Sequence, residues 1–177
     1  MNFDFNASHL IISPWSYESI ASGFLALNVN LLHNATSNAY ISANLAIYVP
    51  FVISSRIIAT QMFTVNGATA GNNIDVGIYT ADGTRLVSIG STAQSGTATI
   101  QAFNITDTEL GPGLYYMAIA MNGTTGTLYS SLPTARALRA MGCFNQATAF
   151  ALPATATFAS VANAYIPVFG LTTRSFL

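Results

Sequence analysis

Residues 74–79 alternate large apolar with small or polar side chains at the period of two that is typical of a half-buried β-strand. Ile74–Tyr79 predicts one strand, and Arg85–Ile89 predicts the next. Between them, Asp82-Gly83 favours a two-residue hairpin turn, because both residues tolerate a positive φ. In that register apolar residues face each other in the pairs Ile78 with Val87, Val76 with Ile89, and Tyr79 with Leu86. A slip by one residue would mix the two faces, so pattern and turn predict the same hairpin.

The residues that follow predict two more strands. Thr97–Ile105 is a threonine-rich strand, and the Leu-Gly-Pro-Gly run at 110–113 is a strong turn signal. Leu114–Met121 is largely apolar on both faces, which predicts a central strand covered on both sides. Asn122-Gly123 then marks another tight turn. These strands together predict an antiparallel β-sheet core.

The flanking regions predict further short strands. Asn44–Ile53 and Arg56–Val65 are joined at Ser54-Ser55, and Pro50 restricts the first strand to a sheet edge or a bulge. The remaining predicted elements are strands at Gly126–Ser130, Phe144–Leu152, Ala156–Ala162 and Tyr165–Phe169, and a two-turn helix between Pro133 and Gly142. The last strand places a proline among aromatic residues, as Tyr48–Phe51 does, which suggests that these two strands are neighbouring edges.

Short strands with regular turn signals and almost no helix predict an all-β fold, an antiparallel β-sandwich of jelly-roll or Greek-key type. Residues 1–39 differ, because asparagines interrupt them and Gly23 weakens a short helix over 18–27. Their apolar residues are nevertheless too many for a disordered tail. We therefore expect an N-terminal arm over 1–39 and a sandwich domain over 40–177. The arm either covers an open end of the sandwich or docks on a neighbouring subunit.

The composition is poor in charge. Charged residues make up 6% of the 177 residues, against about 25% in an ordinary soluble domain, and the chain has no lysine. A net charge of −1 leaves little repulsion between copies, which favours association, although a solvated Thr/Asn-rich β-surface is the alternative. The nearly equal numbers of basic and acidic residues argue against a nucleic-acid partner, which would need a strongly basic surface. No apolar run approaches the roughly 20 residues that span a bilayer, and residues 1–4 lack the basic start of a signal peptide.

The sequence offers little material for catalysis. Cys143 is the only cysteine and is expected to be a small buried hydrophobe, while His9 and His33 both lie in the arm. Asp107 and Glu109 are two oxygen donors for Ca²⁺, but a polar loop explains them better, since calcium takes six to eight oxygens. Asp75, a charge at the start of a strand, is expected to pair with an arginine. We therefore predict no catalytic, cofactor or metal site and a non-enzymatic protein.

Several of these runs together resemble a pattern in small tailed-bacteriophage virion proteins. The similarity covers roughly residues 45–170 and leaves the arm unmatched. The runs that carry it are Asp75–Tyr79, Asp82–Ser88, Gly90–Gly96, Leu110–Ala118 and Tyr165–Pro167. They are turn and core patterns, so the resemblance implies a virion β-sandwich and carries over no functional residue.

This resemblance implies two roles. The first is a capsid decoration (cement) protein in the virion, a homotrimer whose arm and uncharged faces lie on the major capsid protein. The second is a tail-fibre or tail-tip module that binds a host surface glycan, with Trp15, Tyr48 or Tyr79 stacking on sugar rings, although burial in the core is the expected fate of each. A glycan hydrolase would need two carboxylates facing a cleft, and the sequence offers no such pair. The first role is favoured, since a fibre module usually has a long shaft.

Overall fold

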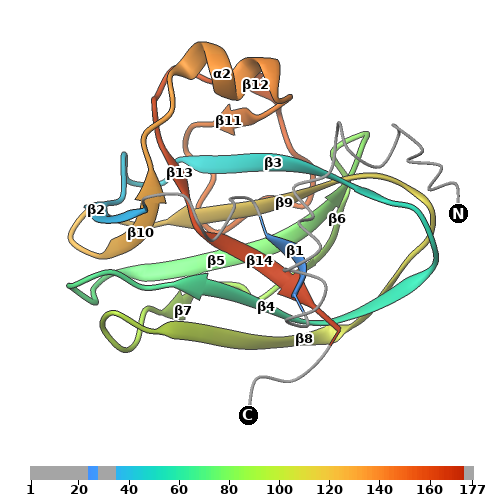
Figure 1. The fold of residues 1–177 in the computed structure, drawn as a ribbon, viewed down its shortest axis with the longest axis horizontal. Helices are drawn as coiled ribbons and strands as arrows, with labels where there is room; N and C mark the ends of the chain where they lie inside the picture. The colour runs from blue at the N-terminus through green and yellow to red at the C-terminus, as the bar shows by residue number, and fades with distance from the viewer. Residues whose placement is uncertain (1–23, 28–34, 174–177) are drawn as a thin grey trace, which may run out of the picture.

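The computed structural model describes residues 24–27 and 35–173, which form mainly antiparallel strands (Figure 1). The strands are β1 Phe24–Leu27, β2 Thr36–Ala39, β3 Ala46–Ile53, β4 Ile57–Val65, β5 Asn73–Thr80, β6 Arg85–Ser88, β7 Thr92–Ala93, β8 Ile100–Leu110, β9 Gly113–Met121, β10 Thr127–Ser131, β11 Phe144–Gln146, β12 Ala159–Ser160, β13 Ile166–Pro167 and β14 Phe169–Thr172. The helix α2, Ala135–Ala140, lies between β10 and β11. The predicted all-β fold with one short helix is confirmed for the described residues.

Two sheets enclose the main core. A seven-stranded sheet has the order β12-β11-β3-β9-β5-β6, with β7 also paired to β5, and a four-stranded sheet has the order β1-β14-β4-β8. A third, three-stranded sheet has the order β13-β10-β2. Alternate residues of β3, β5 and β9 meet residues of β4, β8 and β14 in one buried cluster. This arrangement is sandwich-like, because the inner faces of two sheets share one apolar core.

Strand β9 lies between β3 and β5, and from Tyr116 to Met121 it is buried on both faces, as the sequence predicted, whereas Leu114 near its start is exposed. Met117, Ile119 and Met121 face the main core. Tyr116, Ala118 and Ala120 face a second apolar cluster on the outer side of the sheet, where the segment 144–158 covers them. The small residues of β9 therefore leave room for this covering segment.

The predicted hairpin forms, but its turn is longer than expected. Ile78 lies opposite Val87, as predicted, whereas Tyr79 lies opposite Arg85 instead of Leu86. The hydrogen bond from Thr80 N–H to the Thr84 carbonyl, 2.9 Å, closes a three-residue loop in which Gly83 has φ +89°. A type I turn followed by a left-handed glycine adds a bulge to a hairpin, and this bulge moves Leu86 out of the register.

Strands that adjoin in the sequence separate into different sheets. β3 and β4 match the predicted strands within two residues, but β3 joins the seven-stranded sheet and β4 the four-stranded one, so Ser54-Ser55 crosses between sheets. β8 also belongs to the four-stranded sheet, which corrects the prediction of one sheet from residues 74–121. β8 starts at Ile100 and continues to Leu110, through the segment that was expected to be a polar loop. The pairing of β11 with β3 ends at Tyr48, and from there on β9 alone pairs with β3 among the described residues. Pro50 therefore lies where the other side of β3 is a local sheet edge.

The C-terminal elements differ more from the prediction. The expected strands 144–152 and 156–162 shrink to β11 and β12, because most of the segment between them forms the covering loop. The helix is confirmed: the Thr134 hydroxyl accepts a hydrogen bond from Ala137 N–H, 3.2 Å, and Gly142 with φ +80° ends it. The two proline-bearing strands are not neighbours, because β13 pairs with β10 in another sheet.

Two pieces of the predicted arm are strands of these sheets. β1 pairs with β14, and β2 pairs with β10. Residues 24–27, the end of the weak helix candidate over 18–27, are extended, and the candidate's other residues lie outside the described part of the chain. The division into arm and sandwich domain stays a prediction.

Candidate functional site

Asp75 and Arg85 hold the covering segment by its main chain. The Asp75 carboxylate is fully buried, and its Oδ2 accepts a hydrogen bond from Leu152 N–H at 2.9 Å. Arg85 Nη1 donates to the carbonyl of the same Leu152, and Arg85 N–H donates to the Ala154 carbonyl at 2.9 Å. Arg85 is the arginine near Asp75, but the two side chains bind the N–H and the carbonyl of the same residue, Leu152, and form no direct ion pair.

The environment of Asp75 disfavours its charged form. Desolvation by burial raises the pKa of the carboxyl group, and the hydrogen bond from Leu152 N–H and the nearby Arg85 charge only partly oppose this. Asp75 Oδ1 has no hydrogen-bond partner within 3.5 Å among the described residues. A buried carboxylate with one unsatisfied oxygen is costly, and here it holds a loop in place.

Aromatic rings fill the space between the sheet and the covering segment. Tyr48 meets Tyr79 edge-on at 5.2 Å between centroids and Phe158 edge-on at 5.1 Å. The Tyr79 hydroxyl donates to the Pro153 carbonyl at 2.6 Å, and burial raises the pKa of the Tyr48 hydroxyl to about 12. Tyr48 and Tyr79 are both buried, so neither presents a ring to a sugar. Trp15, the third stacking candidate, lies outside the described residues.

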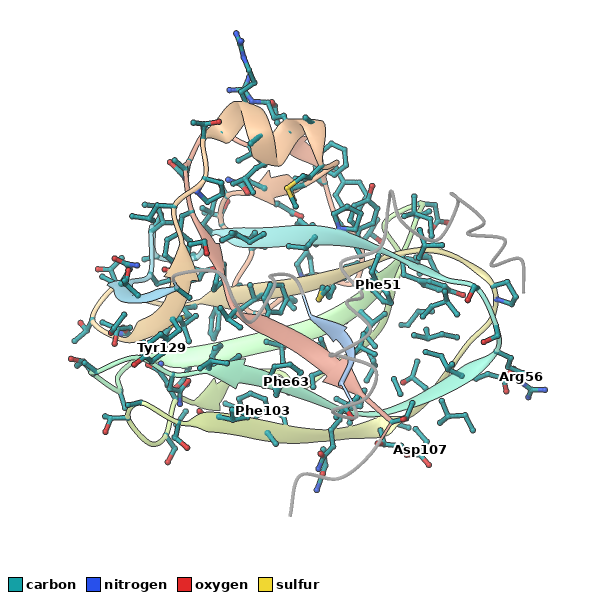
Figure 2. The ribbon with its side chains drawn as sticks, viewed as in Figure 1. Phe51, Arg56, Phe63, Phe103, Asp107 and Tyr129 are labelled. Atoms are coloured by element: carbon teal, nitrogen blue, oxygen red, sulfur yellow. The ribbon has the colours of Figure 1, made fainter. Side chains whose placement is uncertain are left out.

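The other candidates for chemistry are held apart. Cys143 is buried in the main core, as predicted, and desolvation raises the pKa of its thiol to about 11. Glu109 forms a surface ion pair with Arg56, while Asp107 is exposed on β8 (Figure 2). The described residues contain no group of three or more His, Cys, Asp and Glu side chains that could hold a metal. His9 and His33 lie outside this part of the chain.

A buried amide network links the β4–β5 and β7–β8 loops to the first residues of β8 and β10, and sequence reasoning did not identify it. Asn66 is fully buried, and its Nδ2 donates to the Ser95 carbonyl at 2.6 Å and to Gln101 Oε1 at 2.9 Å. Its Oδ1 accepts from Gln94 Nε2 at 3.2 Å, and Gln94 Nε2 also donates to the Thr127 carbonyl at 2.7 Å. The available signal was Asn66-Gly67 and the run Gln94–Gly96, but asparagine and glycine are equally typical of ordinary turns.

The exposed surface combines large apolar residues with few charges. The large hydrophobic residues that stay exposed are Ile41, Val52, Ile58, Leu86, Ile100, Leu114, Leu132 and Met141. The two most exposed, Leu132 at 61% and Met141 at 52%, lie just before and just after α2. α2 itself carries Arg136 and Arg139 on its exposed side. This surface is the strongest candidate for an interaction site.

No protein-family model, curated protein or solved structure matches the chain. The resemblance to tailed-bacteriophage proteins therefore stays a prediction. Among the described residues, no helix is both long and apolar enough to cross a bilayer.

Proposed function

We propose that this chain is a non-enzymatic structural protein of a bacteriophage virion, acting as a capsid decoration protein that binds the major capsid protein and copies of itself. The observation that supports this role is the surface: eight large apolar side chains are exposed among the described residues, and charged residues make up 6% of the sequence. Such a surface gains free energy when another protein covers it, at about 25 cal/mol per Å² of apolar area.

The roles of the reactive side chains are consistent with this proposal. Asp75 holds the covering segment, Cys143 fills the core, and Glu109 pairs with Arg56. Each of these groups has a structural partner, so its presence needs no catalytic explanation. The jelly-roll arrangement and the trimer belong to the same proposal.

The decoration role is tested by adding the purified chain to virions made without its gene. The expected result is saturable binding to the head and a higher temperature at which heads release their DNA, read with a DNA-binding dye. Heads that bind none of the chain, or that release DNA at an unchanged temperature, would contradict the role. A variant of this chain with Leu132→Ser and Met141→Ser tests whether the exposed apolar groups contribute to the binding.

The tail-module alternative needs exposed rings for a glycan, and burial of Tyr48 and Tyr79 removes two of its three stacking candidates. A glycan array is the direct test. Binding to a host polysaccharide would favour this alternative over the decoration role, and the absence of binding would weaken it.

A further inference from the structure

We propose that copies of this chain associate head to tail, the surface around α2 of one copy binding the β4–β8 margin of the next. This inference deepens the proposed assembly role and rests on it. We call Leu132, Arg136, Arg139 and Met141 the helix surface, and Ile58, Asp107 and Glu109 the margin surface. The two lie at opposite sides of the molecule, α2 at one side and β8 at the other (Figure 1).

The helix surface combines apolar side chains with charged side chains that are all positive. Arg136 and Arg139 are exposed, and neither has a carboxylate partner among the described residues, where the ion pair is Arg56 with Glu109. Leu132 and Met141 flank the six-residue helix, which is about 9 Å long. Two apolar side chains near two guanidinium groups that have no carboxylate partner among the described residues fit a partner surface that is both apolar and acidic.

The margin surface is apolar and acidic: Arg56 pairs with Glu109 there, which leaves Asp107 as its carboxylate without an ion-pair partner among the described residues. Ile58 is 49% exposed and lies directly opposite Glu109 in the β4–β8 pairing. Asp107, two residues before Glu109 on β8, is exposed, and Figure 2 shows it with Arg56 far from α2. The described exposed carboxylates are Asp82, Asp107 and Glu109. Two of these three therefore lie beside an exposed isoleucine on β4–β8.

The separation of the two surfaces decides the type of assembly. A surface that binds a different surface of the next copy makes a heterologous contact, which closes into a ring or grows into a filament. With a net charge of −1 per chain, general repulsion does not oppose the contact.

Two charge-reversed variants test the contact by sedimentation velocity over a range of protein concentrations. Arg136→Glu with Arg139→Glu alters only the helix surface, and Asp107→Arg alters only the margin surface. We expect each to weaken self-association by about tenfold or more, because like charges then face each other. Asp82→Arg changes the net charge as much as Asp107→Arg does but lies in the β5–β6 turn, so it should associate like the unaltered chain.

Mixing the two variants gives the decisive result. The intact helix surface of the margin variant should bind the intact margin surface of the helix variant, and the two reversed surfaces are also opposite in charge, so an equimolar mixture should regain the self-association that each variant alone has lost. A monomeric mixture, a monomeric unaltered chain, or unchanged association of both variants would overturn the proposal. If a reversed variant unfolds in circular dichroism, Arg136→Gln with Arg139→Gln, or Asp107→Asn, replaces it. A smaller loss of self-association is then expected, because the attraction is removed but no like charges are brought together, and the association that remains should depend less on salt. Head binding is measured separately, so a failed contact leaves the decoration role to its own test.

Discussion

Replacing Asn66 tests whether the buried amide network holds the loops at one end of the sandwich. Asn66→Ala removes the donors to Ser95, Gly96 and Gln101 and the acceptor for Gln94. A net hydrogen bond contributes roughly 0.5–1.5 kcal/mol, and buried partners left unpaired cost more. Because the bond to Ser95 is short and those to Gly96 and Gln94 are long, we expect a loss of about 2–4 kcal/mol of unfolding free energy.

Asn66→Asp makes a sharper test of the same geometry. The substitution replaces the side-chain amide NH2, which donates to oxygens of Ser95, Gly96 and Gln101, by a carboxylate oxygen that repels those oxygens. Burial and these acceptors raise the folded pKa of the new carboxyl above its unfolded value of about 3.9. The folded variant then binds more protons than the unfolded one, so its stability is highest at low pH and falls as the pH rises through the folded pKa.

Urea unfolding followed by circular dichroism measures both variants at pH 4 and pH 7, with Asn122→Ala as the control. Asn122 is exposed and accepts one bond, from Asn73 N–H at 2.8 Å, which water can replace, so the control should lose less than about 1 kcal/mol. If Asn66→Ala is as stable as the control, or Asn66→Asp shows no pH dependence relative to the unaltered chain, the network does not hold the loops.

Three further predictions concern single buried groups. Burial raises the folded pKa of Asp75 above its unfolded value of 3.8, so the stability that this residue contributes is fully present below that value and is lost as the pH rises through the folded pKa. Asp75→Asn should flatten this dependence of the melting temperature on pH, and an unchanged dependence would contradict the assignment. Tyr79→Phe should lose about 1–2 kcal/mol in urea unfolding, because the Pro153 carbonyl loses its donor, whereas Tyr115→Phe, which loses a longer bond on a half-buried ring, should lose less. Cys143, with a thiol pKa of about 11, should react with a disulfide reagent at pH 8 only after unfolding; rapid reaction of the native chain would show that the thiol is accessible.

Local patterns predicted the strands well where both faces are buried. Leu114–Met121 is apolar at every position, and it forms the strand whose two faces contact two separate clusters. Turn chemistry placed the Leu110–Gly113 turn correctly, because proline fixes φ and glycine tolerates the backbone conformations that a tight turn needs. The hairpin at Asp82-Gly83 was predicted with the right residues and a turn that was one residue too short.

The errors come from features that local pattern does not encode. Ser54-Ser55 is as compatible with a hairpin as with a crossing between sheets, and the choice depends on partners far along the chain. β8 is an edge strand with one exposed face, so Asp107 and Glu109 gave its second half the composition of a loop. Asn66 is an ordinary turn residue by sequence, and its partners Ser95 and Gln101 lie 29 and 35 positions away.

Gold-labelled antibody against this chain, applied to intact virions and viewed by electron microscopy, tests the central proposal most directly. We expect label spread over the head surface, with none on virions that lack the gene. Label confined to the tail tip, or no label on virions that are shown to contain the chain, would contradict a protein that covers the capsid.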